Sequence, residues 1–198
     1  GGFSSGSNHT VAFGPDAVEV ADITADGHPD LVVGGWGNRL YILPGDSTGS
    51  FDSAVLYTVA STEALGIGDL NSDGYIDVVI GVGDKVVVYF GNANGTLTTP
   101  GTSYSVGSDP VDIAVSDMNG DGYLDVLSAN KDGDTVTLLS GSATGVLSFI
   151  GHLDSGGSPT AIAVGDFDGD GLNDIVATNS ESSRGSLITQ TAIPTWAY

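Results

Sequence analysis

The chain has 198 residues, and its 25 acidic and four basic side chains give a formal net charge of −21. This balance excludes a sequence-independent grip on nucleic-acid phosphates, which needs clustered Lys and Arg, and it disfavours an anionic membrane surface. Because 40% of the residues are hydrophobic and none is cysteine, we expect a buried core without disulfides, thiolate zinc sites or a cysteine nucleophile.

The predicted elements recur four times along the chain. A segment over 1–14 is predicted as an outer strand, and four repeats follow at about 15–60, 61–107, 108–157 and 158–198. Each repeat has an alternating apolar stretch, an acidic loop, an aliphatic run, a third run after a polar turn and a fourth, irregular run. This pattern favours strands over helices. Four strands in about 48 residues are typical of a propeller blade, so the predicted fold class is an all-β propeller of four four-stranded blades.

Large apolar residues mark the start of each fourth run. Phe51, Leu97 and Leu147 open it in the first three repeats, and Phe3 and Trp196 occupy the corresponding places near the two ends of the sequence. We therefore expect the N-terminal strand to complete the last blade, within the same chain or in a neighbouring copy. That seam could recruit further copies into a homo-oligomer or polymer, because an unpaired strand edge attracts another strand.

Each repeat also contains a nine-residue acidic loop. Oxygen-bearing side chains occupy positions 1, 3, 5 and 9 of the loops, with glycine at position 6 and a backbone carbonyl at position 7. This spacing predicts a calcium site, because Ca²⁺ takes six to eight oxygen ligands and glycine permits the positive φ of the turn. The candidate ligands are Asp22, Thr24, Asp26, His28 and Asp30; Asp69, Asn71, Asp73, Tyr75 and Asp77; Asp117, Asn119, Asp121, Tyr123 and Asp125; and Asp166, Asp168, Asp170, Leu172 and Asp174.

The four loops offer a cation different amounts of charge. They hold 13 of the 25 acidic residues, which would repel one another without a cation. Up to four Ca²⁺ ions are expected, bound most tightly in the fourth loop, which has four carboxylates. The first loop, with Thr24 and Pro29, should bind most weakly. Metal-free turns are the alternative, and an EF-hand fits less well because position 12 is never glutamate.

The stretch over 110–125, Pro-Val-Asp-Ile-Ala-Val-Ser-Asp-Met-Asn-Gly-Asp-Gly-Tyr-Leu-Asp, resembles the FG-GAP/VCBS repeat. Repeats of this family form the calcium-bearing propeller blades of integrin α-subunit heads and of many secreted microbial proteins. The resemblance covers essentially the whole chain and implies Ca²⁺ between the first two strands of each blade. Family propellers usually have more blades than four. A closed four-blade ring, an eight-blade ring of two chains, an open array and a fragment of a longer protein therefore all remain open.

These features together favour a non-catalytic function outside the cell. We expect a secreted or cell-surface protein for calcium-dependent adhesion, recognition or self-assembly, because millimolar external calcium suits such loops. Its partner would be a protein or glycan ligand, with no nucleic acid and no membrane insertion. The alternatives are a carbohydrate-binding lectin and an accessory propeller domain of a larger secreted polysaccharide-active enzyme.

Two further residue patterns bear on these alternatives. The segment 45–49, Gly-Asp-Ser-Thr-Gly, matches the G-x-S-x-G nucleophile elbow, but the frame recurs as a Gly-x-x-x-Gly turn at 91–95 and 141–145, so no catalytic residue is predicted. Trp36, at the end of a second strand, is expected to be buried in packing. An exposed Trp36 could stack on a sugar.

Overall fold

The computed structural model describes residues 8–11, 14–181 and 184–191. These residues form fifteen strands and no helix, so none of them supplies a helical membrane span. The strands are β1 (Pro15–Ala21), β2 (Asp30–Gly35), β3 (Arg39–Leu43), β4 (Val55–Thr58), β5 (Ala64–Gly68), β6 (Asp77–Val82), β7 (Lys85–Tyr89), β8 (Thr102–Ser105), β9 (Pro110–Ser116), β10 (Asp125–Asn130), β11 (Thr135–Ser140), β12 (Ser148–Asp154), β13 (Pro159–Gly165), β14 (Asp174–Asn179) and β15 (Arg184–Ile188).

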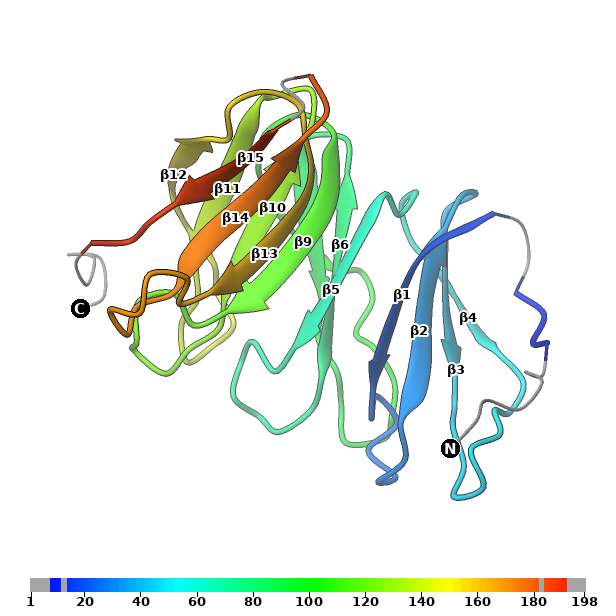
Figure 1. Cartoon of the computed structure of the whole chain (residues 1–198). Helices are drawn as coiled ribbons and strands as arrows, with labels where there is room; N and C mark the ends of the chain where they lie inside the picture. Colours follow the sequence, from blue (N-terminus) through cyan, green and yellow to red (C-terminus); the bar gives the residue numbers. More distant parts are fainter. Residues whose placement is uncertain (1–7, 12–13, 182–183, 192–198) are drawn as a thin grey trace, which may run out of the picture.

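Each repeat forms one antiparallel sheet whose strands pair in chain order (Figure 1). Strands β1–β4, β5–β8 and β9–β12 make three four-stranded sheets, and β13–β15 make a three-stranded sheet. The all-β prediction is confirmed. Consecutive strands pair because the connections between them are short, and antiparallel neighbours can be joined by only a few residues.

The second strand of each sheet is its most buried element. In β6 the sequence Asp-Val-Val-Ile-Gly-Val is buried at every residue except the last. A strand that is covered on both faces reads as a continuous aliphatic run rather than an alternating one. The cover comes from neighbouring sheets, since three clusters of buried apolar side chains fill the spaces between the first and second, second and third, and third and fourth sheets.

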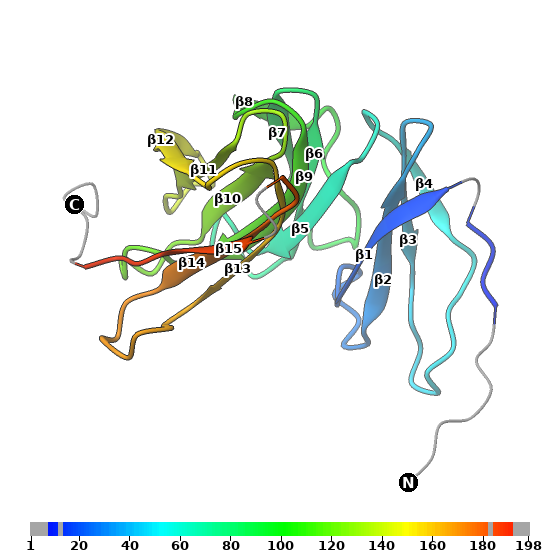
Figure 2. The ribbon, with the colours of Figure 1, turned by 45° about the horizontal axis from the view of Figure 1, so that its top comes forward.

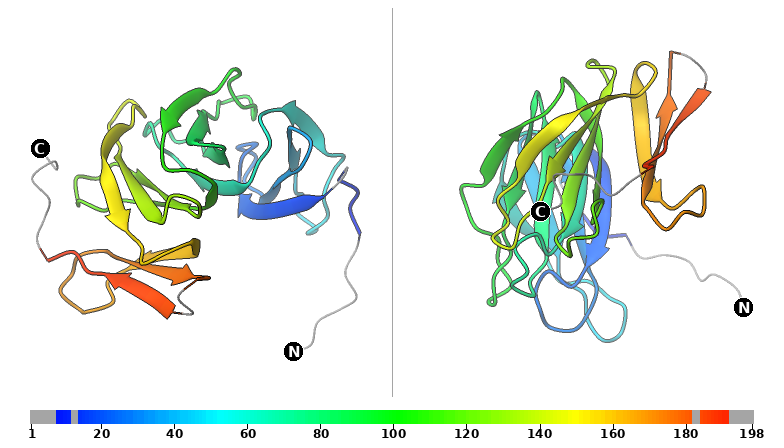
Figure 3. Two further views of the ribbon diagram at one scale, coloured as in Figure 1. Left: turned by 90° about the horizontal axis from the view of Figure 1, so that it is seen from above. Right: turned by 90° about the vertical axis from the view of Figure 1, so that its left-hand side faces the viewer.

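The four sheets stand side by side in an open arc (Figures 2 and 3). Their first strands β1, β5, β9 and β13 lie on the inner side of the arc, each in contact with the next. The first and fourth sheets lie at the two ends of the arc. The described residues therefore form no closed four-blade ring. Four sheets in a row have three interfaces between them, so the outer faces of the first and fourth sheets have no neighbouring sheet among the described residues.

Only part of the predicted outer strand over 1–14 lies within the described residues. Residues 8–11 and 14 are not in a strand, and residues 1–7 and 12–13 lie outside the described residues, so the predicted outer strand over 1–14 stays a prediction. Phe3 and Trp196 lie outside the described residues. The seam that they were predicted to form stays a prediction.

Candidate metal centres

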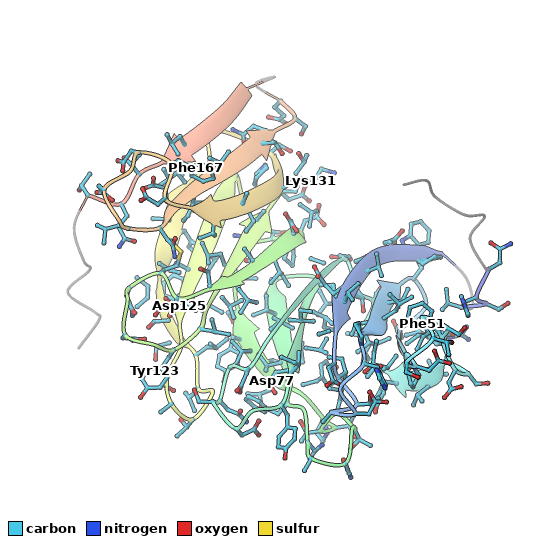
Figure 4. All side chains as sticks on the ribbon, turned by 60° about the horizontal axis from the view of Figure 1, so that its bottom comes forward. Phe51, Asp77, Tyr123, Asp125, Lys131 and Phe167 are labelled. Carbon is cyan, nitrogen blue, oxygen red and sulfur yellow. The ribbon has the colours of Figure 1, made fainter. Side chains whose placement is uncertain are left out.

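The four acidic loops lie at one edge of the sheets. Each joins the first strand of a sheet to the second, and its ninth residue is the first residue of that second strand. Figure 4 shows Asp77, Asp125 and Tyr123 at this edge. Lys131 follows the other end of β10, so the basic side chain lies at the opposite edge of its sheet.

The position-9 aspartates are fully buried and join each loop to the third strand of its sheet. We call Asp30, Asp77, Asp125 and Asp174, each 0% exposed, the joint aspartates. One carboxylate oxygen of each accepts the N–H of loop position 2, from Ile23, Leu70, Met118 and Phe167 at 2.9, 2.8, 2.8 and 3.0 Å. The other oxygen accepts the N–H just beyond the third strand, from Gly45, Gly91, Gly141 and Gln190 at 2.7, 2.8, 2.8 and 2.8 Å.

This structural role was missed in the sequence, where position 9 was assigned only as a ligand. The signal that could have found it is the glycine that recurs after the third run of the first three repeats. A side chain at Gly91 would collide with the carbonyl of Ile76 in the loop of the same sheet. The glycine therefore allows the third strand to approach the loop closely enough for its N–H to reach Asp77.

The position-1 aspartates organise the turn itself. Asp69 accepts the N–H of Asp73 at 3.1 Å on one oxygen and that of Gly74 at 2.8 Å on the other. In all four loops the position-1 carboxylate accepts the N–H of the position-6 glycine. These glycines have φ values of 86 to 88°, as the sequence predicted. Position 4 also has positive φ in every loop, which the sequence analysis missed; the residues there are Ala25, Ser72, Gly120 and Gly169.

Position 3 distinguishes the loops from one another. Asn71 accepts the N–H of Asp73 at 3.1 Å and donates to its carboxylate at 3.0 Å, and Asn119 makes the same pair of contacts in the third loop. In the first loop the hydroxyl oxygen of Thr24 is buried and has no hydrogen-bond partner. A buried hydroxyl without a hydrogen-bond partner lowers the stability of the fold. This hydroxyl lies at loop position 3, where its oxygen could bind a cation.

The fourth loop brings three carboxylates together. Oxygens of Asp166, Asp168 and Asp174 all lie within 4.8 Å of one another, the only group of three or more acidic, histidine or cysteine side chains so placed among the described residues. The second and third loops have an amide in place of the position-3 carboxylate. The fourth loop therefore brings more carboxylate charge together than the second and third loops do. That it binds calcium most tightly stays a prediction.

Burial and mutual repulsion raise the pKa of two joint aspartates. The pKa of Asp77 is raised to about 6, first by burial and then by the neighbouring carboxylates Asp73 and Asp69. The pKa of Asp125 is raised for the same reasons, while the N–H groups that it accepts act in the opposite direction. A divalent cation among these carboxylates would offset the repulsion, and the all-oxygen donor set fits a hard cation such as Ca²⁺.

The loops also differ in how neighbouring sheets cover them. A Cβ atom at Gly95, in the turn after β7, would lie 2.8 Å from the carbonyl oxygen of Thr24 in the preceding sheet. A Cβ atom at Gly145 would lie 2.9 Å from the Cβ of Asn71 in the same way. The turn of one repeat thus packs on position 3 of the loop before it. Asp168 in the fourth loop is exposed, because no further sheet of the described residues packs on it.

All predicted ligand residues lie in the described part of the chain, and each set of five folds into one loop. Backbone N–H groups donate to the side chains at positions 1, 5 and 9 and hold them in place. That these residues bind a cation stays a prediction.

The segment 45–49 forms a local turn in which Asp46 accepts the N–H groups of Thr48 and Ser50 at 2.7 and 3.0 Å. The Thr48 hydroxyl and these N–H groups lower the pKa of Asp46.

Trp36 is 71% exposed, so the expectation that it packs in the core is wrong. It directly follows β2, at the edge of the first sheet opposite the acidic loop. A residue beyond the strand end lies outside the space that two sheets enclose. Its aromatic face is therefore accessible to solvent.

A pair of carboxyl groups that was not predicted from the sequence lies on the inner side of the arc. Glu19 on β1 and Asp112 on β9 are partly buried. Burial raises the pKa of both, and the charge of Asp112 raises that of Glu19 further. Glu19 lines a hollow of about 340 Å³ together with residues of β5, β9 and β13. Only the folding of separate repeats around one axis brings these residues near each other.

The FG-GAP-like repeat family matches the chain at residues 22–80, 69–128 and 117–177. No curated protein sequence matches significantly. Among solved structures, BBS1N in complex with ARL6DN matches with a TM-score of 0.59 and 15% identity, over 92% of this chain and 56% of that chain. An Agrocybe aegerita lectin that recognises non-reducing terminal N-acetylglucosamine matches with a TM-score of 0.56 and 20% identity, over 87% and 51% of the two chains.

The V. cholerae biofilm matrix protein Bap1 matches with a TM-score of 0.51 and 22% identity, over 87% of this chain and 30% of that chain. The chain thus spans about half the length of the first two structures and less of the third. At these identities the likeness shows the fold, which is β-propeller-like.

Proposed function

The chain belongs to the FG-GAP-like repeat family, and from that premise we propose that it is a calcium-stabilised, non-catalytic module for recognition or adhesion outside the cell. The observation that carries the proposal is the hydrogen-bonded scaffold that recurs in all four loops and presents only oxygen donors. The close carboxylates of Asp166, Asp168 and Asp174 support it further. The similar fold of a lectin and of a biofilm matrix protein is consistent with recognition or matrix assembly.

The ligands in each loop would be the side chains at positions 1, 3, 5 and 9 and the carbonyl at position 7. A bound Ca²⁺ would supply two positive charges that offset carboxylate repulsion. The joint aspartates and the position-1 aspartates are already held by backbone N–H donors, so the loop is ordered around the cation position. Because Ca²⁺ would bind the folded state and not the unfolded chain, it would stabilise the protein by mass action.

Secretion or display at the cell surface follows from the same chemistry. Loops of this type suit millimolar calcium, which is found outside cells. A calcium-held fold also needs no disulfide, consistent with the absence of cysteine. The net charge of −21 keeps the molecule away from anionic partners, so the ligand should be neutral or basic.

Calorimetric titration and thermal unfolding test the calcium proposal. We expect Ca²⁺ to raise the melting temperature and a chelator to lower it, with Mg²⁺ much less effective because it prefers to keep several waters. The variant Asp168→Asn should weaken the strongest site. The matched control is Asp132→Asn, which removes an exposed carboxylate outside the loops. Equal melting temperatures in calcium and in chelator would refute the proposal.

Glycan binding is a second candidate, and the exposure of Trp36 favours it. Trp36 is 71% exposed, and Tyr41 and Arg39 lie beside it on the first sheet. Aromatic faces stack on sugar rings, and Arg can donate to sugar hydroxyls. A glycan array with the wild type and Trp36→Ala tests this. Binding that survives Trp36→Ala would show that the sugar lies elsewhere.

A further inference from the structure

The two ends of the arc expose apolar side chains of a kind that the internal interfaces bury. We call the outward side of the fourth sheet, with Phe167 and Leu187, the trailing face. The outward side of the first sheet, with Val18 and Val20, is the leading face. Phe167, Leu187, Val18 and Val20 are 50%, 53%, 60% and 58% exposed.

The trailing face repeats positions that are buried in the other three sheets. Phe167 is at loop position 2, and the residues at that position in the first three loops, Ile23, Leu70 and Met118, are 1%, 0% and 4% exposed. Leu187 pairs with Val176 on the neighbouring strand. The residues in the same register of the other sheets, Ile42, Val88 and Leu138, are 2%, 0% and 7% exposed.

The leading face carries the apolar positions that, in the second and third sheets, pack on the preceding sheet. Val18 corresponds to Leu65 and Ile113, which are 4% and 7% exposed because each packs on the sheet before it. Among the described residues, no sheet precedes the first one. A hollow of about 350 Å³ opens there, lined by Val18 and Leu31 of the sheet and by His9 and Val11 of the segment before β1.

We propose that the trailing face of one copy packs on the leading face of a second copy, and that two such contacts close a ring of eight sheets. The two faces are the two halves of one interface that the chain already forms three times. Heterologous contacts of this kind form a ring when the rotation between copies closes.

Electrostatic repulsion opposes this pairing, because each copy carries a formal charge of −21. The four proposed Ca²⁺ ions would remove eight of these charges per copy, and that part of the argument rests on the proposed function. The apolar contact itself does not depend on calcium. We therefore expect the dimer to be favoured by calcium and by salt, both of which reduce the repulsion.

Light scattering over a range of concentrations, in millimolar calcium at physiological ionic strength, tests the proposal. We expect a species of twice the 19.8 kDa mass of one chain. Val18→Asp and Phe167→Asp should each raise the dissociation constant at least about tenfold, because each places a charge in a buried contact. The matched control is Val146→Asp, at a residue that is 56% exposed and lies on neither face.

Mixing the two variants gives a sharper test. A pair made of one Val18→Asp copy and one Phe167→Asp copy retains one intact contact, whereas each variant alone retains none. The mixture should therefore dimerise more tightly than either variant alone. Circular dichroism confirms that the variants fold.

A monomer at every concentration would overturn the ring and leave the faces to further blades or to another protein. Polymers that lengthen with concentration would also overturn it, because the contacts would not close. A dimer that persists in chelator supports the ring and shows that the contact forms without calcium. The calcium titration of the monomeric Val18→Asp variant, whose substitution lies on β1 and outside the acidic loops, decides the proposed function separately.

Discussion

The joint aspartates should stabilise the fold even without calcium, and Asp77→Ala is the most direct test. Asp77 is 0% exposed and accepts the N–H groups of Leu70 and Gly91, each at 2.8 Å. Alanine would leave both donors buried without a partner. An unsatisfied buried donor costs about 1–3 kcal/mol, so the two together would cost about 2–6 kcal/mol.

Part of this cost is offset because the substitution also removes a buried charge. The raised pKa of Asp77, about 6, shows that its ionised form is disfavoured in the folded protein without a cation. We therefore expect Asp77→Ala to lower the free energy of unfolding by about 2–4 kcal/mol in chelator. Asp77→Asn keeps one acceptor oxygen and should lose roughly half as much.

The matched variant is Asp73→Ala in the same loop. Asp73 is exposed, so water can replace its contacts with Tyr75 and Asn71, and the loss in chelator should stay below about 1 kcal/mol. In calcium, both variants should lose the stabilisation that the second site provides.

Urea unfolding, followed by circular dichroism in chelator and in calcium, measures these differences. The slope of the transition should be unchanged, because neither substitution alters the surface exposed on unfolding. Equal losses for Asp77→Ala and Asp73→Ala in chelator would refute the structural role of the joint aspartates. The position-9 carboxylates would then act only as ligands.

Three further predictions concern other parts of the fold, and urea unfolding measures each. Raised pKa values of Glu19 and Asp112 mean that folding favours their protonated forms, so their contribution to stability should improve as pH falls through the raised values toward 4.5 and 3.8. At pH 7, Glu19→Gln should raise the free energy of unfolding by less than about 1 kcal/mol, because it removes a disfavoured charge. Below pH 4.5 the wild-type carboxyl is already protonated, so no gain is expected there, and a loss of stability at pH 7 would contradict this reasoning. Ala25→Gly should stabilise by about 0.5–1 kcal/mol, because φ is 57° there; no gain would mean that the turn relaxes at no cost. Gly91→Ala should destabilise by about 1–3 kcal/mol through its collision with Ile76, and a neutral result would show that the third strand can shift.

Much of the fold follows from patterns that are local in the sequence. The alternating and aliphatic runs are strands, and the loop glycines such as Gly74 have the positive φ that their spacing predicts. The reason is that strand formation and turn conformation depend on neighbouring residues, and a fourfold repeat presents the same local pattern four times. The candidate ligands could be named on the same basis.

The remaining features depend on segments that are distant along the chain. The partner of Asp77 is the N–H of Gly91, 14 residues away, and the proximity of Glu19 to Asp112 depends on the arc that three sheets form. The sequence does not encode which sheet face lies at an end. Phe167 occupies the same loop position as Leu70, yet one is half exposed and the other is buried. Only the tertiary structure decides this, because burial is set by the presence of a neighbouring sheet and not by the residue itself.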